Sequence, residues 1–106
     1  MAWLVLFIAG ILEIVWAYSM KLSDGFTRPL TTVVTVVTMV ASFGLLALAM
    51  RTLPLGTAYT VWSGIGAAGT FVIGIVVLGE AVTLTRVLAA IMIVGGLVLM
   101  KISTPA

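Results

Sequence analysis

The sequence predicts an all-α integral membrane protein with four spans. Of its 106 residues, 63% are hydrophobic and 8% are charged, whereas soluble globular domains have about 25% charged residues. Four apolar runs occur at about residues 2–20, 30–50, 57–78 and 84–100, and a helix needs about 20 such residues to cross the hydrocarbon. Strand-like alternation is missing, and only helices or closed barrels cross a bilayer. We therefore expect a single membrane domain over residues 1–106, folded as a compact helical bundle.

The first span contains one charged residue, Glu13. It lies about ten residues beyond Trp3, or roughly 15 Å along a helix, which is too deep for its side chain to reach the headgroups. A charge at the centre of a span costs roughly 2.5–3.5 kcal/mol and usually faces a cavity or a partner. Glu13 is therefore the predicted functional centre.

The connections between the spans are short. Pro29 suits the first turn of the second helix, and Thr83 is the expected N-cap of the fourth. Alternating spans put two basic side chains on one side, Arg51 and Lys101, and three on the other, Lys21, Arg28 and Arg86. Orientation normally follows such an asymmetry. This weak bias leaves open whether the chain inserts in one orientation or in both.

The composition excludes several function classes. The chain has no Cys and no His, so disulfides, thiolate metal sites and histidine proton carriers are excluded. No nucleophile–base pair or group of metal ligands occurs, so we expect neither an enzyme nor a cofactor or metal. The net charge of +2 is spread over span ends, which does not resemble a nucleic-acid-binding patch.

Two residues lie one helical turn from Glu13. Gly10 lets a neighbouring helix approach, either for packing alone or to leave space beside the carboxylate. Trp16 offers an indole N–H and lies too deep to be an interfacial anchor. In the second span Ser42 is the deepest of a row of hydroxyls and the best candidate to meet a polar centre. We expect Thr31 and Thr35 in that row to bond their own helix carbonyls.

The third and fourth spans differ in character. On one face of the third lie Tyr59, Trp62, Ser63 and Gly66, whose ring N–H and hydroxyl need polar partners if they are buried. Glycine weakens a helix and permits a bend, and this span holds Gly64, Gly66 and Gly69. Small residues in the fourth span suggest a packing surface within the bundle or between subunits, formed by Ala89, Gly95 and Gly96.

A buried carboxylate beside hydroxyls and aromatic rings is a suitable site for a cation. Desolvation disfavours the ionised form of Glu13, so we expect it to take up a proton when no cation is bound. A bound cation would displace that proton, which couples their movements if the site faces one side at a time. A planar guanidinium suits a carboxylate because it offers parallel N–H donors. Four helices are few for a transport pathway, so we expect a dimer.

Several motifs resemble the small multidrug resistance family, and within it the guanidinium exporters. They are Glu13-Ile-Val-Trp16, Lys21, Gly25-Phe-Thr-Arg28 and Leu53-Pro54-Leu-Gly56-Thr57-Ala58-Tyr59-Thr-Val-Trp62-Ser63-Gly64-Ile-Gly66. The resemblance covers the whole chain. It implies an antiparallel, dual-topology homodimer in the bacterial inner membrane that exchanges protons for guanidinium, with both copies of Glu13 in one shared site.

The resemblance also implies roles for the other residues. Trp16 and Ser42 would orient Glu13 by hydrogen bonding, while Tyr59 and Trp62 line the cavity and Gly10 leaves space. The glycines of the third span would permit a bend, and the fourth span would form the dimer contact.

Two positions depart from the exporter pattern. Ser63 replaces the usual Thr and is common in the multidrug subtype, and Thr60 replaces the usual Ala. These positions are possible determinants of specificity. An exporter of quaternary-ammonium or polyaromatic cations and a non-transporting membrane subunit are the alternative functions.

Overall fold

The computed structural model describes residues 1–103 and contains four helices in that part of the chain. They are α1 (Ala2–Leu22), α2 (Pro29–Ala49), α3 (Leu55–Val76) and α4 (Leu84–Ser103). All four are long and apolar enough to cross a membrane. The predicted spans are confirmed in number and order, and the chain is a multi-pass membrane protein.

The helix ends show local signals that the sequence carries. Pro29 lies in the first turn of α2, and the Thr83 hydroxyl accepts a hydrogen bond of 3.2 Å from the Arg86 amide at the start of α4. Both observations agree with the sequence-based expectation.

Helix α3 begins and ends two residues earlier than expected. Its N-cap is Pro54, with a φ of −59°, and a proline with this φ is already disposed for a helix start. At the other end Gly79 adopts a φ of 70°, and the Glu80 amide donates to the Gly74 carbonyl at 2.9 Å. A left-handed glycine of this kind ends a helix because it turns the chain away.

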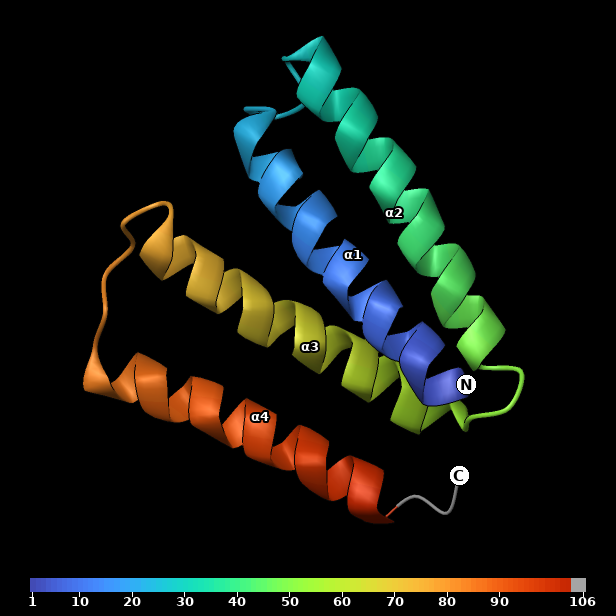
Figure 1. Ribbon diagram of the computed structural model, residues 1–106. Coiled ribbons are helices and arrows are strands. Elements are labelled where there is room, and N and C mark those ends of the chain that lie inside the picture. Colours follow the sequence, from blue (N-terminus) through green and yellow to red (C-terminus); the bar gives the residue numbers. More distant parts are fainter. Residues whose placement is uncertain (104–106) are drawn as a thin grey trace.

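The helices lie side by side in the order α2, α1, α3, α4 (Figure 1). Helix α1 packs most extensively against α2 and then against α3, while the backbone of α4 approaches α3 alone among the described helices. The Cα atoms extend over 43 × 35 × 16 Å. The four helices are consistent with the expected four-span bundle, and within it the single chain forms an open layer whose broad faces have no cover of their own.

The buried apolar core lies at one end of this layer, where α1 begins, α2 ends and α3 begins. Its members are Leu6, Ala9, Leu46, Ala49, Leu53, Ala58, Val61 and Trp62. At the same end the Lys101 ammonium lies 5.0 Å from the centroid of the Trp3 ring. The end of α4 is thus beside the start of α1, as four successive spans require.

Hydroxyl groups join α1 to α2 in the interior. Ser19 Oγ lies 2.8 Å from both the Thr31 carbonyl oxygen and the Thr35 hydroxyl. The Thr35 hydroxyl also donates to the carbonyl of Thr31 at 2.7 Å. Thr35 therefore bonds its own helix as expected, and in addition it connects to α1.

Candidate functional site

Glu13 lies in the middle of α1 and rests against α3 at Gly66. A Cβ atom added at residue 66 would overlap the Glu13 carboxyl group and lie only 2.8 Å from its Cγ. Gly66 itself is buried. The carboxylate therefore occupies a notch in α3 that exists because residue 66 has no side chain.

Gly10 has a different role from the one that the resemblance implied. A Cβ atom added there would lie 2.6 Å from Cγ2 of Ile65, so this glycine allows close packing of α1 on α3. The space beside the carboxylate comes from Gly66. Of the two interpretations of Gly10, the structure supports packing.

The expected hydrogen bonds to Glu13 are not formed in this structure. Glu13 Oε1 and Trp16 Nε1 are both buried, and neither has a hydrogen-bond partner among residues 1–103. The Ser42 hydroxyl donates to the Ala9 carbonyl at 2.7 Å and accepts from Trp62 Nε1 at 3.0 Å. A buried polar atom without a partner costs about 1–3 kcal/mol. The carboxylate is therefore poised to gain a proton or a cationic donor.

Four aromatic rings from three helices form a continuous row beside Glu13. Trp16 meets Phe43 edge-on at 6.1 Å between centroids, Phe43 lies 5.7 Å from Trp62, and Trp62 lies 5.6 Å from Tyr59. Aromatic faces attract cations. The row begins at Trp16, one helical turn from Glu13, and its rings are of a kind that can contact a cation.

Phe43 is the member of this row that the sequence analysis missed. It follows Ser42 directly, and it is exposed on the face of α2. The sequence signal that could have identified Phe43 is its position directly after Ser42, at the same depth in the span. The structure shows that Phe43 connects Trp16 to Trp62.

The possible specificity residues lie at the edge of the site. Thr60 is exposed and Ser63 is half-buried. Neither side chain forms a hydrogen bond with the part of the chain that the structure describes. Both hydroxyls therefore stay available to a ligand or to a second chain.

The glycines of α3 serve helix packing in this structure. Added Cβ atoms would overlap Leu97 of α4 at Gly64 and Ile14 of α1 at Gly69. Helix α3 runs unbroken from Leu55 to Val76. A bend at these residues stays a prediction.

The small residues of α4 lie at the surface of the described chain. Ala89, Gly95 and Gly96 are exposed, and Cβ atoms added at Gly95 and Gly96 would meet nothing within 4 Å. No residue of α4 is buried. The dimer contact at this helix stays a prediction.

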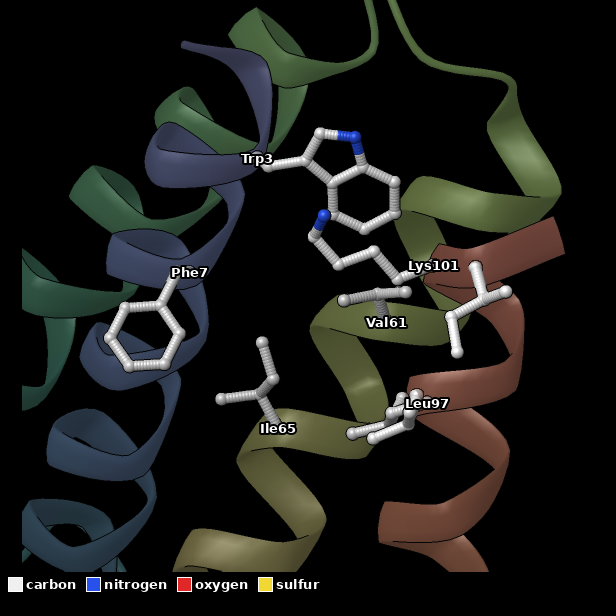
Figure 2. Close-up of a pocket in the computed structure, with 8 residues that line it drawn as sticks. Trp3, Phe7, Val61, Ile65, Leu97 and Lys101 are labelled. Atoms are coloured by element: carbon white, nitrogen blue, oxygen red, sulfur yellow. The ribbon is translucent and has the colours of Figure 1, made fainter. Parts of the chain in front are cut away.

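An apolar groove of about 380 Å³ lies away from Glu13, between α1, α3 and α4 (Figure 2). In Figure 2, Trp3 and Phe7 face it from α1 and Ile65 lies between the helices, while the Lys101 stem extends beneath the Trp3 ring. Its lining has one charged group and is otherwise apolar apart from the indole N–H. This groove therefore offers no carboxylate to a ligand.

Comparison with known proteins gives a consistent picture. A family model described as Small Multidrug Resistance protein matches residues 1–102. A protein of Yersinia pseudotuberculosis named guanidinium exporter is 50% identical over 104 residues, which cover 98% of this chain and 100% of the relative. Proteins with the same name from Proteus vulgaris and Salmonella typhimurium are 47% and 49% identical, with 98% of this chain and 100% and 99% of the relatives covered.

Proposed function

The chain belongs to the small multidrug resistance family of transporters and is not an enzyme, and we propose that it exports guanidinium in exchange for protons. Small substituted guanidinium cations would be further substrates. The observation that carries this proposal is the Glu13 carboxylate, seated on Gly66 with a buried oxygen that has no hydrogen-bond partner among residues 1–103. The names of the relatives, each similar over nearly the full length, support guanidinium as the cation.

Proton and guanidinium compete for Glu13 in this proposal. In the buried site an ionised carboxylate without a partner is unfavourable, so the empty site binds a proton. Guanidinium stabilises the ionised form because its parallel N–H groups match the two carboxylate oxygens. Trp16 Nε1, one turn away and also unpaired, is a donor that can reorient towards the carboxylate when the ligand is bound or released.

The functional unit in this proposal is an antiparallel, dual-topology homodimer in the bacterial inner membrane. Three observations support it. The basic residues are almost evenly divided between the two ends, the chain forms a layer only 16 Å thick, and Cβ atoms added at Gly95 and Gly96 of α4 would meet nothing within 4 Å in the described chain. A second copy would cover these surfaces, and the two Glu13 carboxylates would share one site.

The test is a current measurement on purified protein reconstituted into liposomes on a solid-supported membrane. We expect guanidinium to evoke a current in the wild-type protein and none in Glu13→Gln, because the amide keeps the shape but carries no charge and releases no proton. Asp24→Asn, which neutralises a carboxylate outside the spans, is the control and retains a current. Guanidinium currents that persist in Glu13→Gln would contradict the proposal.

A multidrug function is the second candidate, and Ser63 together with the exposed ring of Tyr59 favours it. It predicts currents with tetrapropylammonium and none with guanidinium. A non-transporting membrane subunit is the third candidate. It predicts that well-folded protein gives no current with either cation.

A further inference from the structure

Small side chains line the seam between α1 and α3 beyond Glu13, towards one end of the molecule. On α1 the residues facing this seam are spaced four apart, at Glu13, Ala17 and Lys21. On α3 the same spacing gives Gly66, Thr70 and Gly74. Residues spaced in this way lie above one another on one helix face. Beyond Glu13 and Gly66, these residues line a cavity of about 140 Å³, together with Tyr18, Ile73, Leu78 and Glu80.

At the mouth of the seam the Glu80 carboxylate packs on a glycine of α3, as Glu13 does in the middle of the seam. A Cβ atom added at Gly74 would lie 2.5 Å from Glu80 Oε1 and 2.9 Å from its Cδ. The Glu80 amide also donates to the Gly74 carbonyl at 2.9 Å. Each carboxylate thus rests on a glycine of α3, and the two glycines are separated by eight residues, or about 12 Å of helix.

The Glu80 carboxylate also pairs with a guanidinium group, that of Arg86, which lines a second cavity on the α4 side of α3. Its Nη2 lies 3.9 Å from Glu80 Oε1 and its Nη1 donates to the Ala81 carbonyl at 2.8 Å. The same guanidinium carbon lies 5.4 Å from the centroid of the Phe71 ring. Carboxylate, carbonyl and aromatic face are the groups that would receive a free guanidinium ion.

The ion pair between Arg86 and Glu80 is placed so that a free cation can replace the Arg86 side chain. The side chains of Arg86 and Glu80 are 44% and 45% exposed, and exposed ion pairs of this kind are weak. Lys21 lines the same cavity opposite Glu80 without an ion pair to it. Its charge opposes a cation that stays at the mouth.

We propose that Glu80 is an outer binding residue for guanidinium, where the free cation exchanges with the Arg86 side chain on its way between solution and Glu13. The inference rests on the proposed export of guanidinium. The carboxylate raises the local concentration of the cation, and Lys21 limits its residence. In an antiparallel dimer one such mouth would open on each side of the membrane.

The experiment measures the guanidinium concentration that gives half-maximal current in reconstituted protein. A contribution of 0.2–1 kcal/mol from an exposed charge corresponds to a change of about 1.4- to 5-fold. We expect Glu80→Gln to raise the half-maximal concentration by about this factor. Lys21→Gln and Arg86→Gln should lower it, because the first removes a charge that repels guanidinium and the second removes a group that competes with it for Glu80. All three changes should shrink at high salt, which screens exposed charges.

Asp24→Asn is the matched control, because it removes the same charge at the same end of the molecule from a residue that does not line the cavity. It should leave the half-maximal concentration unchanged. Equal effects of Glu80→Gln and Asp24→Asn would overturn the inference, as would Lys21→Gln and Arg86→Gln variants without any increase in affinity. Lys21→Gln and Arg86→Gln keep Glu80, so they test its role even if Glu80→Gln does not fold.

The two levels of the proposal fail differently. If wild-type protein gives no guanidinium current, the proposed function is wrong. If the wild-type current is present and is lost in Glu13→Gln, but the mouth variants behave like Asp24→Asn, only the role of Glu80 is wrong.

Discussion

Gly66→Ala tests whether the notch in α3 is necessary for transport. The added methyl group would overlap the Glu13 carboxyl group and come within 2.8 Å of its Cγ. Either the carboxylate rotates out of the notch or α1 and α3 move apart. Both outcomes displace the group that we propose binds proton and cation, so the expected result is loss of transport by a folded protein.

The expected change in the stability of the Gly66→Ala variant follows from two opposing effects. Overpacking in a well-packed interior costs about 1–3 kcal/mol, while alanine is favoured over glycine within a helix by about 1 kcal/mol. The net destabilisation is thus between about zero and 2 kcal/mol, small enough for the protein to fold. We expect the transport current to fall by at least about tenfold, equivalent to about 1.4 kcal/mol, because the strain falls on the carboxylate itself.

The chain offers two matched controls. Gly69→Ala places its methyl group against Ile14, so it causes similar overpacking without touching the carboxylate. Gly44→Ala in α2 meets nothing within 4 Å and should be neutral or slightly stabilising. The assay pairs guanidinium currents with thermal unfolding of the purified protein. If Gly66→Ala transports as well as Gly69→Ala at equal stability, the notch is irrelevant.

Two further changes address the surroundings of the site. Ser42→Ala removes the acceptor of the buried Trp62 N–H and the donor to the Ala9 carbonyl, and leaving such groups unpaired should cost about 1–3 kcal/mol. Thermal unfolding measures this loss, and Ser42→Thr, which keeps the hydroxyl, should recover part of it. Lys101→Gln removes the cation near the Trp3 ring, a contact worth about 0.5–1 kcal/mol at an exposed site. Its expected result is a shifted tryptophan emission with unchanged guanidinium currents.

The sequence was sufficient for the spans because membrane insertion depends on length and composition, which can be read locally. It also singled out Glu13, since a lone carboxylate within an apolar run is conspicuous. Ser42 and Trp62 were placed together near the polar centre, and the structure joins them by a hydrogen bond of 3.0 Å. Their role towards Glu13 stays a prediction.

The remaining features depend on how α1 is aligned with α3. Gly10 lies on the same helix as Glu13, whereas Gly66 lies on α3, and only the relative shift of the two helices decides which residue of α3 faces Glu13. Phe43 was missed for the same reason, because its contacts lie on α1 and α3. The open shape of the bundle cannot be derived from composition either, since α4 is as apolar as a buried helix and yet has no buried residue.

Glycines on α3 connect the site to the shape of the whole layer. Gly64 receives Leu97 of α4, Gly66 receives Glu13, and Gly69 receives Ile14 of α1. These contacts fall within about two helical turns. A bend of α3 in this stretch would therefore move the wall behind Glu13 together with the support for α4. The carboxylate would leave its notch as the helix changed shape, and this is the coupling between ligand and conformation that exchange of a proton for a cation requires.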